Sequence, residues 1–134
     1  MLTMSRNHLL IATVVMLLIV GVTATQAKKA TETFSGQYDW SQGGSDRLSA
    51  EFKPVGVDSW KITFRFHFSG RHETWKGTAT GSLADGSTLT GTATSGNRNW
   101  TFEAGIEDGV MHGSHREVKR SGREYPTGTF KLSR

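Results

Sequence analysis

The chain has 134 residues, of which 35% are hydrophobic and 21% charged, with a formal net charge of +4 at pH 7. This length allows one domain, and the composition excludes an integral membrane bundle and a typical disordered tail. Sixteen glycines without a Gly-X-Y repeat exclude collagen and indicate many tight turns. Because cysteine is absent, disulfides, a thiol nucleophile and thiolate metal sites are also excluded.

The first element is an apolar run from Leu9 to Val22 that follows a basic residue, Arg6. A membrane-spanning helix needs about 20 apolar residues, so this run is short for a permanent span. Small residues follow it, with Thr25 and Ala27 in the positions of a small-x-Ala cleavage signal. The pattern predicts a secretory signal peptide over residues 1–27, cleaved after Ala27 or after Ala24.

Export places the mature chain in an extracytoplasmic location, either secreted or periplasmic. The alternative is an uncleaved signal anchor that tethers the chain to the membrane, because Lys28 and Lys29 lie directly beyond the apolar run. We expect contact with the membrane only through this segment, and only if it is not cleaved. The mature part begins with a polar, flexible lead-in at 28–33, and a single domain follows at 34–134.

The clearest structural signal in the domain is the stretch Trp60–Phe68, where every even position is large and apolar and every odd position is polar. A period of two predicts a β-strand with one buried face. The same alternation predicts seven further strands, over 34–40, 48–53, 75–80, 89–94, 100–104, 110–118 and 127–132.

Seven glycine-containing breaks separate the eight predicted strands: Gly43-Gly44, Gly56, Gly70, Asp85-Gly86, Ser95-Gly96, Asp108-Gly109 and Ser121-Gly122. Regular spacing without helical segments predicts an antiparallel meander. The expected fold is therefore all-β, as a small up-and-down, calycin-like barrel. A two-sheet sandwich uses the same alternation and stays open as the alternative.

The opening residues Phe34–Trp40, followed by Gly44-Ser45, resemble the first hairpin of avidin-type barrels, which pairs a Gly-x-Trp start with an Asn and a Gly-Ser. Tyr38 stands in the place of that tryptophan and no asparagine follows, so the resemblance implies a barrel and no biotin binding. The size and the export signal are also similar to small bacterial barrel-type protease inhibitors, whose disulfide this chain lacks.

The predicted inner face combines large rings with glycines at positions 36, 77, 91, 113 and 128. In one interpretation the glycines relieve crowding and the rings fill the core. In the other, the glycines leave a pocket for a small ligand. The candidate ligand-binding residues are then Trp60, Trp75, Trp100, Phe64 and Phe102.

Motifs of catalysis and cofactor binding are missing from the sequence: it has no G-x-S-x-G elbow, Walker A loop or dinucleotide-binding glycine pattern. His112 and His115 are three apart, so on a strand they face opposite sides and cannot clasp one metal ion together. His67 or His72 can join one of them only across strands. We therefore expect no enzyme, no cofactor and no metal site.

Basic residues concentrate near one predicted hairpin, where Arg116, Lys119, Arg120 and Arg123 lie close in sequence. Such a cluster can contact an anionic polymer, an envelope surface or a protein partner, or it can be a solvated turn. Nucleic acid is not expected for an exported protein. The sequence thus predicts a small, non-catalytic exported protein that binds an apolar or aromatic ligand or an extracytoplasmic partner. The alternative is a surface interaction protein that uses the basic hairpin.

Overall fold

The computed structural model describes residues 29–134, so the predicted signal peptide lies outside the described residues. In the described part, no helix is long and apolar enough to cross a membrane. Eight strands make up the fold: β1 (Glu32–Trp40), β2 (Ser45–Gly56), β3 (Ser59–Phe68), β4 (Arg71–Gly81), β5 (Thr88–Ser95), β6 (Arg98–Glu107), β7 (Val110–Val118) and β8 (Glu124–Ser133).

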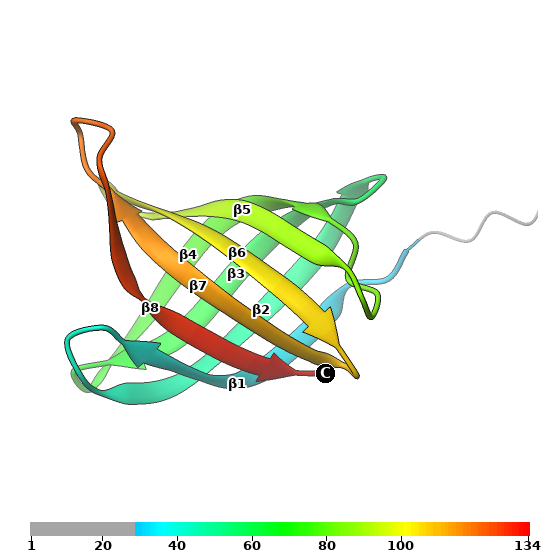
Figure 1. The fold of residues 1–134 in the computed structure, drawn as a ribbon, viewed down its shortest axis with the longest axis horizontal. Helices are drawn as coiled ribbons and strands as arrows, with labels where there is room; N and C mark the ends of the chain where they lie inside the picture. Colours follow the sequence, from blue (N-terminus) through cyan, green and yellow to red (C-terminus); the bar gives the residue numbers. More distant parts are fainter. Residues whose placement is uncertain (1–28) are drawn as a thin grey trace, which may run out of the picture.

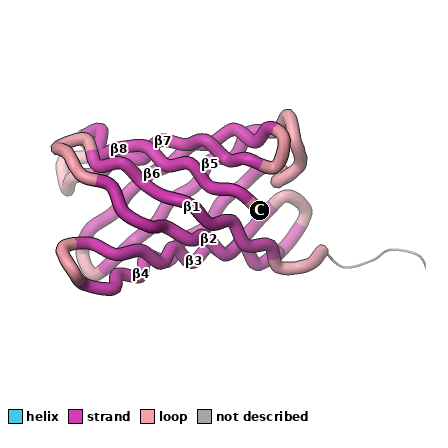
Figure 2. The backbone as a smooth tube through the Cα atoms, turned by 90° about the horizontal axis from the view of Figure 1, so that it is seen from below, coloured by secondary structure: helices cyan, strands magenta, loops and turns pink. Residues whose placement is uncertain are grey.

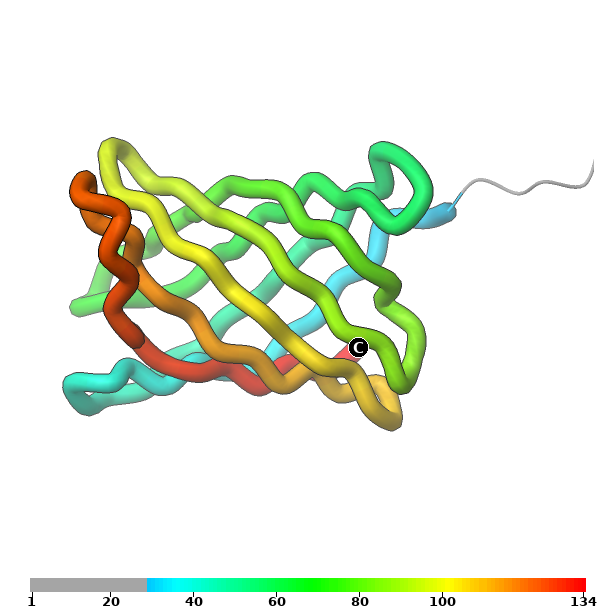
Figure 3. The backbone as a smooth tube through the Cα atoms, turned by 45° about the horizontal axis from the view of Figure 1, so that its top comes forward, coloured from blue at the N-terminus to red at the C-terminus, as the bar shows by residue number. Residues whose placement is uncertain are grey.

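Each strand pairs antiparallel with the next one along the chain, and β1 closes the sheet by pairing with β8 (Figure 1). The structure therefore confirms the all-β meander and selects the barrel over the sandwich. Closure satisfies the hydrogen-bonding groups of both edge strands, which an open eight-stranded meander would leave exposed. The strands cross the barrel obliquely, as Figure 3 shows, because closing a sheet requires the strands to tilt.

The turns follow the predicted breaks with one shift. Asp108 and Gly109 both have positive φ, 51° and 75°, as a two-residue hairpin turn requires. At the second break, however, Gly56 stays inside β2 and the turn consists of Val57 and Asp58, where Asp58 has φ 48°. Aspartate tolerates this backbone conformation, so it replaces glycine as the turn residue. The first strand also begins at Glu32, two residues before the predicted position.

The two ends of the barrel differ; Figure 2 shows their loops at the left and at the right. One end holds both chain ends of the domain, the β4–β5 loop at 82–87 and the β2–β3 and β6–β7 turns. There Leu83 is buried and belongs to the same hydrophobic core as the fully buried Phe34 and Phe52. Arg134 pairs with Glu32 and donates to the Leu83 carbonyl, which fixes the loop over this end. We call it the closed end.

The wall glycines serve close packing. A Cβ on Gly77 would overlap the carbonyl oxygen of Thr92 on β5, so only glycine lets the two strands approach this closely. A Cβ on Gly113 would overlap the ring of Phe130, which occupies the space beside the β7 backbone that a side chain would need. At these positions the packing interpretation holds: glycine permits the curvature and the aromatic ring covers it.

Candidate functional site

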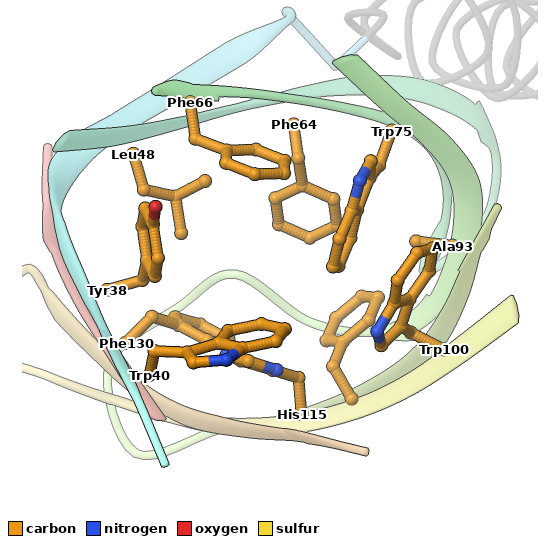
Figure 4. A pocket seen from close by; sticks show the side chains of 11 residues that line it. Tyr38, Trp40, Leu48, Phe64, Phe66, Trp75, Ala93, Trp100, His115 and Phe130 are labelled. Atoms are coloured by element: carbon orange, nitrogen blue, oxygen red, sulfur yellow. The ribbon is translucent and has the colours of Figure 1, made fainter. Parts of the chain in front are cut away.

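The opposite end of the barrel, which holds the β1–β2, β3–β4, β5–β6 and β7–β8 turns, contains a cavity open to solvent. We call this cavity the aromatic cup. Eleven side chains, with at least one from each of the eight strands, line it (Figure 4): Tyr38, Trp40, Leu48, Phe64, Phe66, Trp75, Ala93, Trp100, Phe102, His115 and Phe130. Eight of the eleven are aromatic rings of phenylalanine, tyrosine or tryptophan, so the cup offers flat apolar faces.

The cup is small, with a volume of about 40 Å³. A single water needs roughly 10–15 Å³ on this measure, and pockets for drug-sized ligands span roughly 300–1,000 Å³. Most of the interior is therefore packed, and a narrow cup remains at one end. Trp40 and Trp75 are the two lining residues that are only partly buried.

Two tryptophans stack inside the cup. The rings of Trp75 on β4 and Trp100 on β6 have centroids 3.6 Å apart and lie 17° from parallel. The two residues belong to strands separated by β5, which contributes only the small Ala93 to the wall between them. Trp100 is 2% exposed, and its indole Nε1 is the one buried side-chain polar atom of residues 29–134 that has no hydrogen-bond partner.

His115 is the polar residue buried in the cup wall. Its Nδ1 lies 2.6 Å from the hydroxyl oxygen of Thr127, and that hydroxyl donates its proton to the His115 carbonyl oxygen at 3.0 Å. The ring must therefore donate through Nδ1, which leaves Nε2 as an acceptor. Burial lowers the pKa of the His115 imidazole to about 4, so the ring is neutral at pH 7.

Three charged side chains lie beside Trp100 at the open end of the barrel, and we call them the rim triad: Arg98, Glu117 and Lys119. Arg98 donates to both Glu117 oxygens, at 3.2 and 3.0 Å, and Lys119 Nζ lies 3.1 Å from Oε1. The hydrogen bond from Arg98 lowers the pKa of the Glu117 carboxyl, against the opposing effect of burial, and Lys119 adds to the lowering. The Arg98 guanidinium also lies 4.9 Å from the centroid of the Trp100 ring.

The two ends of the barrel carry opposite charge. Counted with one flanking residue on each side, the turns at the open end contain one acidic residue, Glu124, and five basic ones: Arg71, Arg98, Lys119, Arg120 and Arg123. The three turns at the closed end, counted in the same way, contain no basic residue and four acidic ones: Asp58, Asp85, Glu107 and Asp108. The turns around the mouth of the cup therefore carry a net positive charge.

Of the five predicted ligand-binding residues, the structure brings four together in the cup: Trp75, Trp100, Phe64 and Phe102. Trp60 does not line it. Its ring is 3% exposed near the closed end, against Phe52, and its Nε1 donates to the Gly81 carbonyl at 2.8 Å. The alternation predicted correctly that Trp60 lies on the inner face of the sheet. It does not indicate at which end of the barrel a residue lies.

The predicted ligand-binding set omitted seven of the eleven lining residues: Tyr38, Trp40, Leu48, Phe66, Ala93, His115 and Phe130. Tyr38 and Trp40 share the inward parity of Phe34 on β1, so the alternation contained the signal for both. Tyr38 also fixes the wall, because its hydroxyl donates to the His67 carbonyl on β3. Burial of the Tyr38 phenol raises its pKa.

The four basic residues of the predicted surface site do not share one surface. Lys119, Arg120 and Arg123 lie on the β7–β8 turn at the open end, where Lys119 is paired with Glu117. The Arg123 guanidinium lies 5.8 Å from the ring centroid of Tyr125. Arg116 instead faces outward from the wall of β7, opposite Thr101 on β6.

Two histidines meet on the outer wall. His67 on β3 and His72 on β4 are cross-strand partners, and their ring centroids are 4.0 Å apart. His112 is exposed and His115 is buried, so they face opposite sides of the sheet. Within residues 29–134, no group of three or more His, Asp or Glu side chains is placed to hold a metal ion.

Comparison with known proteins adds no family to this description. None of the models of known protein families matches the chain, and no curated protein has a significantly similar sequence.

Proposed function

We propose that the protein is a small exported, non-catalytic binding protein whose aromatic cup takes a small apolar or aromatic molecule. The observation that carries this proposal is a solvent-open cup lined by aromatic rings at one end of an otherwise packed barrel. Apolar surface that stays open in this way gains free energy when a ligand covers it. Export rests on the pattern of residues 1–27.

The size of the cup sets the size of the occupant. At about 40 Å³ it is below the roughly 150 Å³ that holds benzene in an engineered cavity. An alkyl chain can therefore insert only its end, and an aromatic ring enters only if the half-buried Trp40 and Trp75 side chains move outward. Because the mouth is open, the rest of the ligand remains at the rim.

A fluorescence titration of residues 28–134 with hexanol and with benzyl alcohol tests this proposal. Occupancy should shift and quench the tryptophan emission in a saturable way, because Trp75 and Trp100 line the cup. The Ala93→Leu variant fills the cup and should abolish the saturable change. The control is Thr92→Leu, which adds the same side chain at an exposed neighbouring position. Both variants are first checked for folding by urea denaturation.

Saturable binding that Ala93→Leu removes and Thr92→Leu retains supports the proposal. Absence of saturable binding by both alcohols, or binding that Ala93→Leu leaves unchanged, overturns it.

A second candidate function is contact with an anionic partner, such as an acidic polysaccharide, through the open-end turns. The specific observation in its favour is the concentration of Lys119, Arg120 and Arg123 on one exposed turn. Retention on heparin at physiological salt, lost in the Arg120→Glu, Arg123→Glu double variant, supports this function. Elution that the double variant leaves unchanged excludes it.

A further inference from the structure

The indole N–H of Trp100 points to a chemical property of the ligand. Nε1 of tryptophan is a donor only, and buried donors in folded proteins nearly always have an acceptor. Trp60 follows this rule, since its Nε1 donates to the Gly81 carbonyl. Trp100 does not, although its side chain is 2% exposed and lines the cup. An occupant with an acceptor oxygen would complete the site.

The other buried polar groups of the cup do not supply this acceptor. The Tyr38 hydroxyl is engaged with the His67 carbonyl, and Nδ1 of His115 is engaged with Thr127. Nε2 of His115 is an acceptor, but Trp100 Nε1 has no partner among residues 29–134. An acceptor for this donor would therefore have to come from outside the described residues.

The charge at the rim indicates the sign of the ligand. The rim triad combines two cations, Arg98 and Lys119, with the single carboxylate of Glu117, so it carries one positive charge in excess. No Asp or Glu side chain lines the cup itself. A ligand with one negative charge at the mouth neutralises the triad, whereas a cationic ligand adds to the repulsion.

The Trp100 indole and the charged rim triad are neighbours. Glu117 is the direct cross-strand partner of Trp100, and the Arg98 guanidinium lies 4.9 Å from the centroid of the Trp100 ring. An oxygen that accepts from Trp100 Nε1 is therefore close to the rim triad. A carboxylate has two oxygens, so one can accept from the indole while the other faces the cations.

We propose that the ligand is a monoanionic amphiphile, with a small apolar body in the cup and a carboxylate that accepts a hydrogen bond from Trp100 Nε1 beside the rim triad. This inference rests on the proposed function and adds the charge and the acceptor of the ligand. It concerns reversible binding only, without a covalent step.

Two matched sets of probes test the inference by isothermal titration calorimetry: hexanoate, hexanol and hexylamine, and benzoate, benzyl alcohol and benzylamine. Within a set the apolar body is constant and only the polar group changes. The acid should bind about tenfold more tightly than the alcohol, because hydrogen bonds to charged groups are stronger than neutral ones by about that factor. The amine should bind most weakly. Added salt should narrow the difference between acid and alcohol.

Two variants separate the donor from the charge. Trp100→Phe keeps an aromatic ring and removes the N–H, so the affinity for the acid should fall about tenfold. Its matched control is Trp60→Phe at the closed end, which should leave affinity unchanged. Lys119→Gln brings the net charge of the rim triad to zero, so it should weaken the binding of the acid more than the binding of the alcohol. Its control, Lys131→Gln on the exposed face of β8, should alter neither.

The outcomes distinguish the two proposals. If none of the six probes binds, the proposed function fails and the inference fails with it. If the alcohols bind and the acids bind no more tightly, the cup is an apolar site and only the inference is overturned. Tightest binding by the amines, or acid binding that Trp100→Phe leaves unchanged, also overturns the inference alone.

Discussion

The imidazole of His115 and the hydroxyl of Thr127 hold each other in place through two hydrogen bonds. The ring donates through Nδ1 to the hydroxyl oxygen at 2.6 Å, and the hydroxyl donates to the His115 carbonyl at 3.0 Å. This pair joins β7 to β8 inside the wall of the cup, at the register irregularity between these strands. It also requires a neutral ring, because protonation would place an uncompensated charge in an apolar cavity.

Stability should therefore fall on mild acidification. The pKa of His115 is lowered from 6.5 to about 4 by burial, so the unfolded chain takes up a proton before the folded one does. The contribution to stability is complete above pH 6.5 and is lost as the pH falls towards 4, on the order of 3 kcal/mol in all. Urea unfolding at several pH values across this window measures it.

The variant His115→Gln should show less of this acid dependence than the wild type, whereas His112→Gln, which replaces an exposed histidine, should retain it. Equal acid dependence in all three proteins would mean that His115 is not the titrating group.

Two buried tryptophans should respond differently to the same substitution. Trp60→Phe removes the hydrogen bond to the Gly81 carbonyl and leaves that acceptor without its partner. Trp100→Phe removes a donor that has no partner, so only packing is lost. Urea denaturation of the ligand-free proteins should give Trp60→Phe the larger loss, by about 1 kcal/mol. A larger loss for Trp100→Phe would indicate that its N–H has a partner in solution, such as a bound water.

The effect on stability of replacing a strand glycine by alanine should depend on which atoms the added Cβ meets. Gly77→Ala places a Cβ against the Thr92 carbonyl, so β4 and β5 must separate, and we expect a loss of about 1–3 kcal/mol. Gly105→Ala in β6 meets no atom within 4 Å, and it reduces the freedom of the unfolded chain. It should be neutral or slightly stabilising. Thermal unfolding of both variants distinguishes these results, and equal effects would contradict the assigned role of Gly77.

The alternation of Trp60–Phe68 and the glycine breaks were sufficient to predict eight strands and a meander, because burial on one face of a strand is a local property of the sequence. Closure of the sheet into a barrel does not follow from the alternation, because a two-sheet sandwich has the same alternation. The position of the cup could not be predicted from alternation. Trp60 and Trp100 have the same parity, yet one packs at the closed end and the other lines the cup.

The rim triad depends on the register of the β6–β7 hairpin. Arg98 and Glu117 are far apart in the sequence, and only the register of β6 against β7 places Glu117 beside Trp100 and within reach of Arg98. The predicted basic cluster therefore included Lys119 but not the acidic residue that binds it.

Removing the carboxylate from the rim should strengthen the binding of an anionic probe. Glu117→Gln raises the excess charge of the rim triad from one to two and frees the Arg98 guanidinium from its paired hydrogen bonds. One added charge about 4 Å from the ligand is worth about 1 kcal/mol in a highly solvated site, so benzoate should bind about fivefold more tightly. Calorimetry at low and at physiological salt measures this gain, which salt should reduce.

The matched control is Glu103→Gln, which makes the same change of charge on the exposed face of β6, away from the rim. It should alter benzoate affinity little. Equal gains in the two variants would assign the effect to net charge alone, and no gain with Glu117→Gln would show that the rim triad does not contact the anion. Because Arg98 and Lys119 keep the pKa of the Glu117 carboxyl low, wild type and variant should differ throughout the neutral range and converge only in acid, where the carboxylate is protonated.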